Sequence, residues 1–378
     1  MLLLWLGALV ALWPTLLGAL AEAGLAAAGW PGMQATVSET GVSRTAITLR
    51  PEGWRGAPVS LAVDHPWSDL LREGRVHLSL TVPDLAAVPF PPDWGLRATT
   101  GRLTFRGVLV WTGGHWDGNG VAEIGGAAGQ AGPVDFAGLS GRVPLAGLNP
   151  PTIPDDTALT AERVDAGTLM TDAEAVFGLR RNGKISVTKI ETAWAGGRLL
   201  TRPFVITPAQ GGPAAALTLE VVGVDVATVL ALADVAGLEG TGALSGRVPM
   251  VLNGGRLRIE SGRLAADEPG VVRYDSARAP RGALQAEGDT PVGAVMKALS
   301  DFRYDTLEML LDGTVGEEMA ARLVVRGANP SFYDGTPVAL TLNLSGALDR
   351  VVRRGLDSYR LPQRLGEGLA PRVRSGAP

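Results

Sequence analysis

Apolar and polar residues alternate with a period of two along much of the chain. In residues 338–344 (Val-Ala-Leu-Thr-Leu-Asn-Leu) every second side chain is a large aliphatic one. Residues 75–82, 102–106, 256–260 and 320–326 repeat the pattern. Successive side chains of a β-strand point to opposite faces of the sheet, so each segment is predicted to be a strand with one dry and one wet face.

Glycine-rich turn signals separate these segments. They include residues 117–120 (Asp-Gly-Asn-Gly), 253–255 (Asn-Gly-Gly) and 312–313 (Asp-Gly), while residues 181–184 (Arg-Asn-Gly-Lys) predict a tight hairpin. A spacing of roughly 8–12 residues between turns predicts about 25 to 30 strands. Because ordinary sheets rarely exceed about ten strands without curling or splitting, the pattern allows two sandwiches or one long twisted sheet wrapped into a trough.

Helical patterns are few. Residues 225–235 form one, with Asp225 as a candidate N-cap, and residues 291–299 form another, with a proline in the first turn. A third pattern, residues 347–359, carries basic side chains, and the tail 364–378 is predicted to be disordered. The chain is therefore predicted to be mainly β.

Composition narrows the class further. Of 378 residues, 46% are hydrophobic and 19% charged, which is too apolar for a disordered chain. A formal net charge of −4 gives no electrostatic basis for binding nucleic acid. With no cysteine, the chain has neither disulfides nor thiolate metal sites.

The N-terminus is a candidate membrane segment. No ionisable side chain precedes Glu22, and about 20 apolar residues are what a helix needs to cross the hydrocarbon core. We therefore predict an uncleaved transmembrane anchor. A cleaved signal peptide is the alternative, because residues 19–21 (Ala-Leu-Ala) have the small-x-small form of a cleavage site.

Residues with catalytic potential do not form a recognisable constellation. His65, His77 and His115 lack the spacing of metal ligands. Ser140 and Ser245 are not in a nucleophile-elbow motif, and they are predicted to satisfy turns instead. We predict a protein that is not an enzyme and that needs no metal or cofactor.

Several motifs occur in the order found in a known family. Residues 237–250 (Gly-Leu-Glu-Gly-Thr-Gly-Ala-Leu-Ser-Gly-Arg-Val-Pro-Met) are followed by residues 269–274 (Pro-Gly-Val-Val-Arg-Tyr), and residues 139–145 contain an earlier echo of Leu-Ser-Gly-Arg-Val-Pro. These motifs resemble the C-terminal domain of the YdbH-like family of bacterial envelope proteins. That domain is also called the dicarboxylate-transport domain, and the family is grouped with AsmA and TamB relatives. The resemblance extends over roughly residues 165–357.

The resemblance implies a long, twisted, solenoid-like β-groove behind an N-terminal transmembrane helix. It divides the chain into an anchor (1–29), an N-terminal β region (30–150), a YdbH-like groove domain (151–363) and a tail (364–378). Family members are typically much longer, so the chain resembles a short or truncated member. The implied location is the bacterial inner membrane, crossed once, with the bulk of the chain in the periplasm.

The implied function is transport of phospholipid between membranes in a hydrophobic groove. Exposing about 30 methylene groups of a phospholipid to water would cost on the order of 20–25 kcal/mol of free energy, at about 0.8 kcal/mol each. An aliphatic lining removes that cost. A small lipoprotein or an outer-membrane partner would complete the path. The predicted lining consists of Val76, Leu78, Leu80, Leu103, Phe105, Leu257, Ile259, Leu323, Val325, Val338, Leu340, Leu342 and Leu344.

Three alternatives stay open from the sequence. The same aliphatic residues would also fill the core of an ordinary sandwich. A dicarboxylate-binding protein would need converging basic side chains, for which Arg142 and Arg247 are the candidates. The third alternative is a structural scaffold in envelope assembly.

Overall fold

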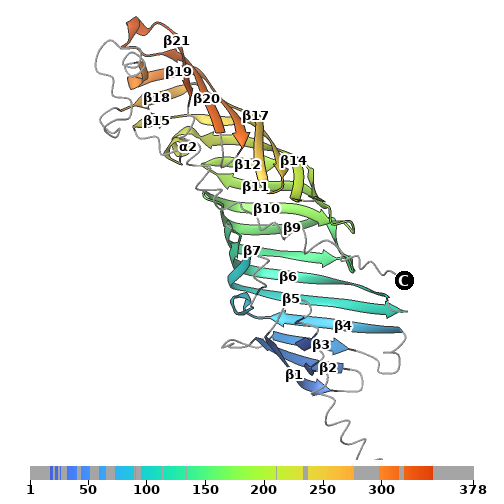
Figure 1. Cartoon of the computed structure of the whole chain (residues 1–378). Coiled ribbons are helices and arrows are strands. Elements are labelled where there is room, and N and C mark those ends of the chain that lie inside the picture. Colours follow the sequence, from blue (N-terminus) through green and yellow to red (C-terminus); the bar gives the residue numbers. More distant parts are fainter. Residues whose placement is uncertain are drawn as a thin grey trace, which may run out of the picture. The chain divides into compact units, whose positions relative to one another are not determined.

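The fold is one antiparallel β-sheet with a few short helices (Figure 1), which confirms the mainly β prediction. The chain divides into two compact units. The computed structural model describes residues 18–19, 22–23, 26, 32–40, 44–51, 59–64, 73–88, 90, 95–112, 115–132, 134–209, 211–232, 237–275, 298–314 and 319–343.

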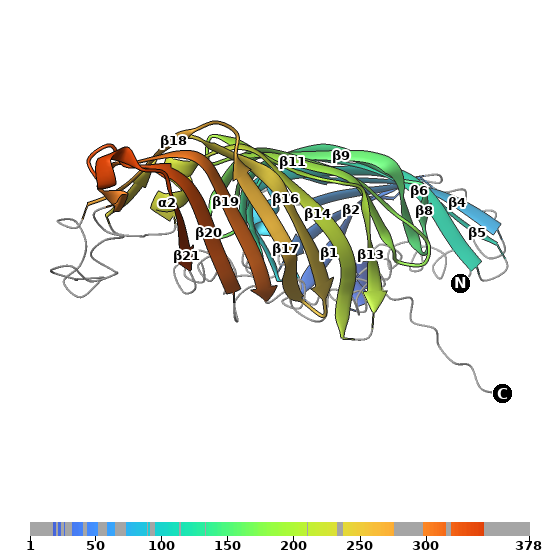
Figure 2. The same ribbon diagram turned by 90° about the horizontal axis from the view of Figure 1, so that it is seen from above.

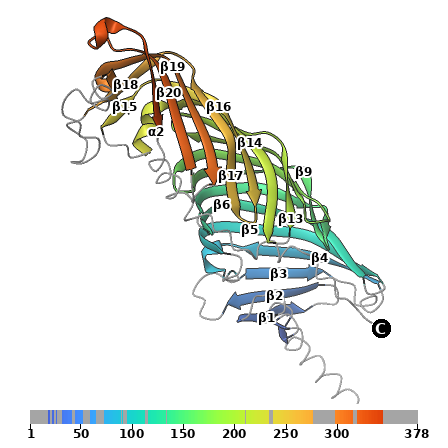
Figure 3. The ribbon, with the colours of Figure 1, turned by 45° about the horizontal axis from the view of Figure 1, so that its top comes forward.

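The first unit comprises described residues up to Arg163 together with Ala175–Val187. From β1 to β7 each strand pairs with the next strand in the chain, so this part is a simple meander, visible in Figure 3. Its elements are β1 (Met33–Thr40), β2 (Arg44–Pro51), β3 (Val59–Asp64), β4 (Glu73–Val82), the 3-10 helix η1 (Leu85–Ala87), β5 (Leu96–Thr112), β6 (His115–Ala131), β7 (Val134–Leu145), β8 (Gly147–Leu148) and β9 (Pro151–Asp165).

The second unit comprises Val164–Glu174 and the described residues from Thr188 onward, so β10 (Leu169–Leu179) and β11 (Ile185–Trp194) contribute to both units. Strands β14, β16, β17, β19, β20 and β21 pair in that order and lie side by side in Figure 2. Its further elements are β12 (Gly197–Thr201), β13 (Phe204–Ala209), β14 (Gly212–Asp225), α2 (Val226–Leu232), β15 (Leu238–Gly240), β16 (Ala243–Asn253), β17 (Arg256–Ala266), β18 (Gly270–Tyr274), η3 (Leu299–Asp301), β19 (Phe302–Thr314), β20 (Met319–Ala328), η4 (Tyr333–Gly335) and β21 (Val338–Asn343).

The alternating segments lie in strands, as predicted. The hairpin and the helix that local signals predicted are also present. In the hairpin between β10 and β11, Arg180 N donates to Lys184 O at 2.9 Å. At α2, Asp225 accepts hydrogen bonds from the backbone N–H groups of Ala227 and Thr228, at 3.3 and 3.1 Å. The predicted N-cap is therefore confirmed.

Two predicted turns are wrong. Residues 117–120 lie inside β6 and residues 312–313 lie inside β19, so strands continue where the sequence predicted breaks. The described residues form 21 strands. Tertiary contacts override the local turn preference. The carboxylate of Asp117 accepts hydrogen bonds from Leu148 N at 3.0 Å and Asn149 N at 3.2 Å, far along the chain.

Among the described residues, no helix is long and apolar enough to cross a membrane. Most of the predicted anchor, residues 1–29, falls outside the described residues. The same holds for nearly all of the predicted helix 291–299, for the helix 347–359 and for the tail 364–378.

Asp117 anchors the start of β6, and we expect Asp117→Asn to lower the free energy of unfolding. Three backbone N–H groups, of Gly118, Leu148 and Asn149, and then Arg181 at 3.3 Å hold the pKa of this carboxyl below its usual 3.8. A depressed folded-state pKa stabilises the fold above pH 3.8, and this contribution disappears as the pH falls through the folded-state pKa. Urea unfolding of both proteins at pH 7 and pH 3 should show a difference that shrinks at pH 3.

The control is Asp135→Asn, which removes an exposed carboxylate on β7 and should change neither value. A destabilisation by Asp117→Asn of equal size at both pH values would contradict the assignment.

Candidate functional site

Strand register gathers the predicted lining of the first unit on one face of the sheet. Leu80 pairs with Phe105, and Phe105 pairs with Ala122 on the next strand. The backbone of Val76 pairs with Leu109 in the same register, although its side chain lies outside the described part. We call this set the first apolar face: Leu78, Leu80, Val82, Leu103, Phe105, Leu109, Ala122, Ile124, Val143 and Leu145.

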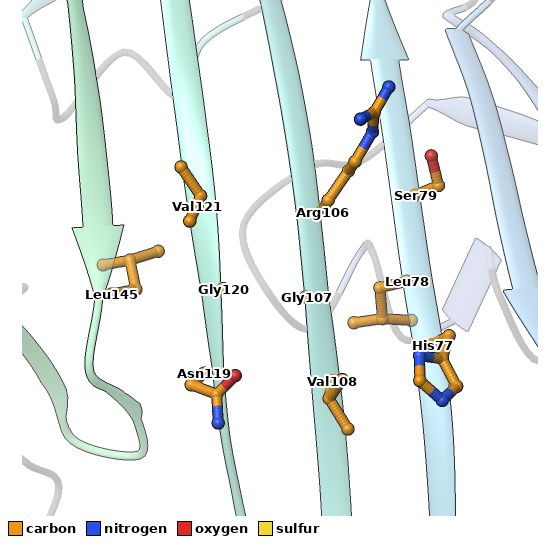
Figure 4. Close-up of a pocket in the computed structure, with 10 residues that line it drawn as sticks. All are labelled: His77, Leu78, Ser79, Arg106, Gly107, Val108, Asn119, Gly120, Val121 and Leu145. Atoms are coloured by element: carbon orange, nitrogen blue, oxygen red, sulfur yellow. The ribbon is translucent and has the colours of Figure 1, made fainter.

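The other face of the same strands carries most of the polar side chains, together with Val108, Val110 and Val121, and it holds a hollow of about 570 Å³. Figure 4 shows its lining, in which the guanidinium of Arg106 points away from His77. Leu78 and Leu145 belong by register to the apolar side. Because Arg106 and His77 point apart, the polar groups of this hollow do not converge on one point.

One end of the first apolar face is covered by the segment that follows β4. Leu85, Val88 and Phe90 pack with Val82 and Leu103 in a buried cluster. The segment is fixed locally, because the Asp84 carboxylate caps η1 by accepting a hydrogen bond from Ala86 N at 3.0 Å.

The rest of the first apolar face is only half-buried. Its side chains lie outside the buried cluster, and Trp116, on the same face near the start of β6, is 46% exposed. All described strands belong to one sheet, so no second described sheet packs on this face. The two-sandwich interpretation is therefore wrong for the described part of the chain. The half-buried side chains are Leu78, Phe105, Leu109, Ala122, Val143 and Leu145.

Glycines let the ring of Phe105 lie against the sheet. A Cβ atom at Gly120 would be 2.6 Å from ring atoms Cε2 and Cζ of Phe105, and one at Gly107 would be 2.7 Å from Cζ. An aromatic ring that covers strand glycines restores some of the burial that these residues lack. The ring of Phe105 therefore occupies space that side chains at Gly107 and Gly120 would otherwise fill.

Register also unites the predicted lining of the second unit. Ile259 pairs with Met250, Leu323 with Met309, and Val325 with Leu340. The backbone of Leu342 pairs with Leu323, but its side chain, like the whole of Leu344, falls outside the described residues. The second apolar face comprises Leu217, Leu219, Val221, Leu244, Val248, Met250, Leu257, Ile259, Leu264, Leu307, Met309, Leu311, Ala321, Leu323, Val325, Val338 and Leu340.

Much of the second apolar face is a closed core. Leu323 and Val325 are 3% and 0% exposed, so they are packing residues in this structure. Helix α2 lies over this part, where Val226 and Leu230 belong to the same buried cluster. Leu257, Val338 and Leu340 are half-buried, and Val338 and Leu340 pack against the edge of that buried cluster.

The repeated Leu-Ser-Gly-Arg-Val-Pro phrase builds the same bulge in both units. Ser140 Oγ accepts a hydrogen bond from Gly126 N, and Ser245 Oγ accepts one from Gly223 N, both at 2.9 Å. Both glycines have φ near +60° and lie at irregularities of the preceding strand. Each serine thus satisfies a backbone group, as predicted, but at a glycine bulge inside a strand and not at a turn.

The arginine of each repeat pairs with a glutamate three residues before the bulge glycine. Arg142 lies opposite Glu123, at 3.9 Å, and Arg247 lies opposite Glu220, at 3.4 Å. Arg202, followed by Arg247, lowers the pKa of the Glu220 carboxyl. The shared Glu-x-x-Gly spacing could have been found in the sequence, and it accounts for both arginines as cross-strand ion pairs.

The histidines stay apart. His77 and His115 are exposed on β4 and β6, and His65 lies outside the described residues. In the part of the chain that the structure describes, no three His, Cys, Asp or Glu side chains are grouped to hold a metal ion.

These features define a class of protein: a single antiparallel sheet whose distinctive surface is a partly open aliphatic face. The model of the YdbH-like family, described as intermembrane phospholipid transport protein YdbH, matches residues 54–369. The chain belongs to this family. The match is longer than the resemblance expected from short motifs, because it also includes β3 to β9 of the first unit. No curated protein and no solved structure matches the chain.

We expect Gly120→Ala to destabilise the protein by about 1–3 kcal/mol, because the new methyl group overlaps the ring of Phe105. In a Phe105→Ala background the same change should cost less, with a coupling of about 1 kcal/mol. Denaturant unfolding of the wild type, both single variants and the double variant measures this coupling. Additive effects would show that the ring does not depend on the glycine.

Proposed function

We propose that the chain carries phospholipid between membranes, with acyl chains lying on the half-buried part of the first apolar face. The observation that supports this most directly is a continuous row of aliphatic side chains over β4 to β7 with no described second layer. Membership of a family described by intermembrane phospholipid transport supports the same function.

The chemistry of this face suits an acyl chain. Its residues offer dispersion contacts and no hydrogen-bonding groups. Moving an acyl chain from water onto such a surface would stabilise it by about 0.8 kcal/mol for each methylene group buried. The Phe105 ring, lying against Gly107 and Gly120, adds an aromatic surface to the aliphatic one. In this proposal the protein binds and guides the lipid and catalyses no reaction.

The proposal extends to location and partners. The apolar residues 1–21 would anchor the chain in the bacterial inner membrane, with the remainder in the periplasm. The strands would form a β-groove, and a small lipoprotein or outer-membrane partner would receive the lipid. The half-buried residues Leu257, Val338 and Leu340 would continue the lining in the second unit.

A photo-crosslinking amino acid at Leu78 should capture phospholipid in cells, because this side chain lies on the first apolar face. The matched control is Ser79, the next residue of β4, which is also half-buried but faces the polar side. Mass spectrometry of the purified adducts identifies the lipid. Equal capture at both positions, or none at Leu78, would refute a lipid path on this face.

A charge on the path should block transfer. We expect Ala122→Glu to reduce phospholipid transfer between donor and acceptor vesicles about tenfold or more, because an acyl chain would have to pass a desolvated carboxylate. Val121→Glu, on the adjacent residue and the opposite face, should transfer lipid like the wild type. Unfolding curves of both variants check that the fold persists. Equal transfer by the two variants would contradict the proposal.

A further inference from the structure

The polar face of the second unit carries an unusual row of charges. Successive register positions across β14, β16, β17, β19 and β20 hold one acidic, three basic and one aliphatic residue. In order across the strands, these are Glu220, Arg247, Arg263, Leu310 and Arg322.

Among the described residues, two of the three arginines have no acidic partner. Glu220 is bound by Arg202 at 2.8 Å and by Arg247 at 3.4 Å. Arg263 and Arg322 form no ion pair within the described part of the chain, and both are exposed. Arg263 also lies directly opposite Arg247. Like charges in directly opposed positions destabilise a sheet, so the row departs from what stability alone would favour.

A hollow of about 650 Å³ lies between the two unpaired arginines. Leu310 separates them by two strand spacings, or about 10 Å, a span that two long side chains can close over one ligand. The bulge at Ser261, with φ 55°, forms its wall together with the small side chain of Ala320.

One carboxylate completes the hollow. Asp312 Oδ2 accepts a hydrogen bond from Ser261 N at 3.0 Å, so the side chain is held in place while Oδ1 stays available to a second donor. Two guanidinium groups and one fixed carboxylate complement a molecule that carries a phosphate and an amine. Arginine is suited to the phosphate, because its planar fork donates two parallel hydrogen bonds.

We propose that this hollow is a binding site for a zwitterionic phosphoester, with the phosphate between Arg263 and Arg322 and the ammonium group at Asp312. The ligand is either the head group of a membrane lipid or a soluble phosphoamine. The site lies on the polar face, so it does not depend on the first apolar face carrying acyl chains.

Titration of the full chain with phosphoethanolamine, followed by ³¹P NMR, tests the site. We expect Arg263→Gln and Arg322→Gln each to weaken binding about tenfold or more, because each removes a charged hydrogen-bonding partner of the phosphate. Asp312→Asn should abolish the preference for phosphoethanolamine over inorganic phosphate. Arg326→Gln, an exposed arginine on the same face of β20 outside the hollow, is the matched control and should bind like the wild type.

Failure of the wild type to bind phosphoethanolamine, or wild-type affinity in both Arg263→Gln and Arg322→Gln, would overturn the proposal. Flotation with vesicles of phosphatidylethanolamine then separates the two sources. A lipid head group requires vesicle binding that Arg322→Gln abolishes, whereas a soluble ligand requires binding to phosphoethanolamine but not to vesicles. Capture of lipid at Leu78 tests the first apolar face and not this hollow. The proposed lipid transport and the proposed phosphoester site can therefore fail independently.

Discussion

The structure depends on how the apolar face of a single sheet is shielded from water. A β-strand with alternating side chains always presents one dry face, and in most antiparallel proteins a second sheet or a layer of helices buries it. Here all 21 described strands belong to the same sheet, so this solution is absent among them. Short segments from the chain itself provide what cover there is.

The two units solve the problem to different extents. In the first unit, Leu85, Val88 and Phe90 cover one end of the face and leave a half-buried row of aliphatic side chains beyond it. In the second unit, α2 packs Val226 and Leu230 into a closed core. Burial of this kind stabilises the fold, whereas the uncovered row retains an affinity for apolar partners. Under the proposed function, the closed core serves stability and the half-buried row serves binding.

The polar face shows a similar division. The repeated bulge places a serine on a glycine N–H and an arginine opposite a glutamate in both units, so Arg142 and Arg247 are accounted for by the sheet. Arg263 and Arg322 are not accounted for in this way. A residue that local packing does not explain is a better candidate for ligand binding than one with a structural partner.

The sequence by itself determined the strands, their dry faces, the hairpin at residues 181–184 and the cap of α2, because these depend on neighbours within a few residues. It also identified the family. It could not determine that residues 117–120 and 312–313 stay extended, since the partners of Asp117 lie some 30 residues away. Only the tertiary structure decided which predicted lining residues are half-buried and which lie in a closed core. Leu78 and Leu323 have the same alternating pattern, but Leu323 lies in the core into which α2 packs, whereas Leu78 stays half-buried.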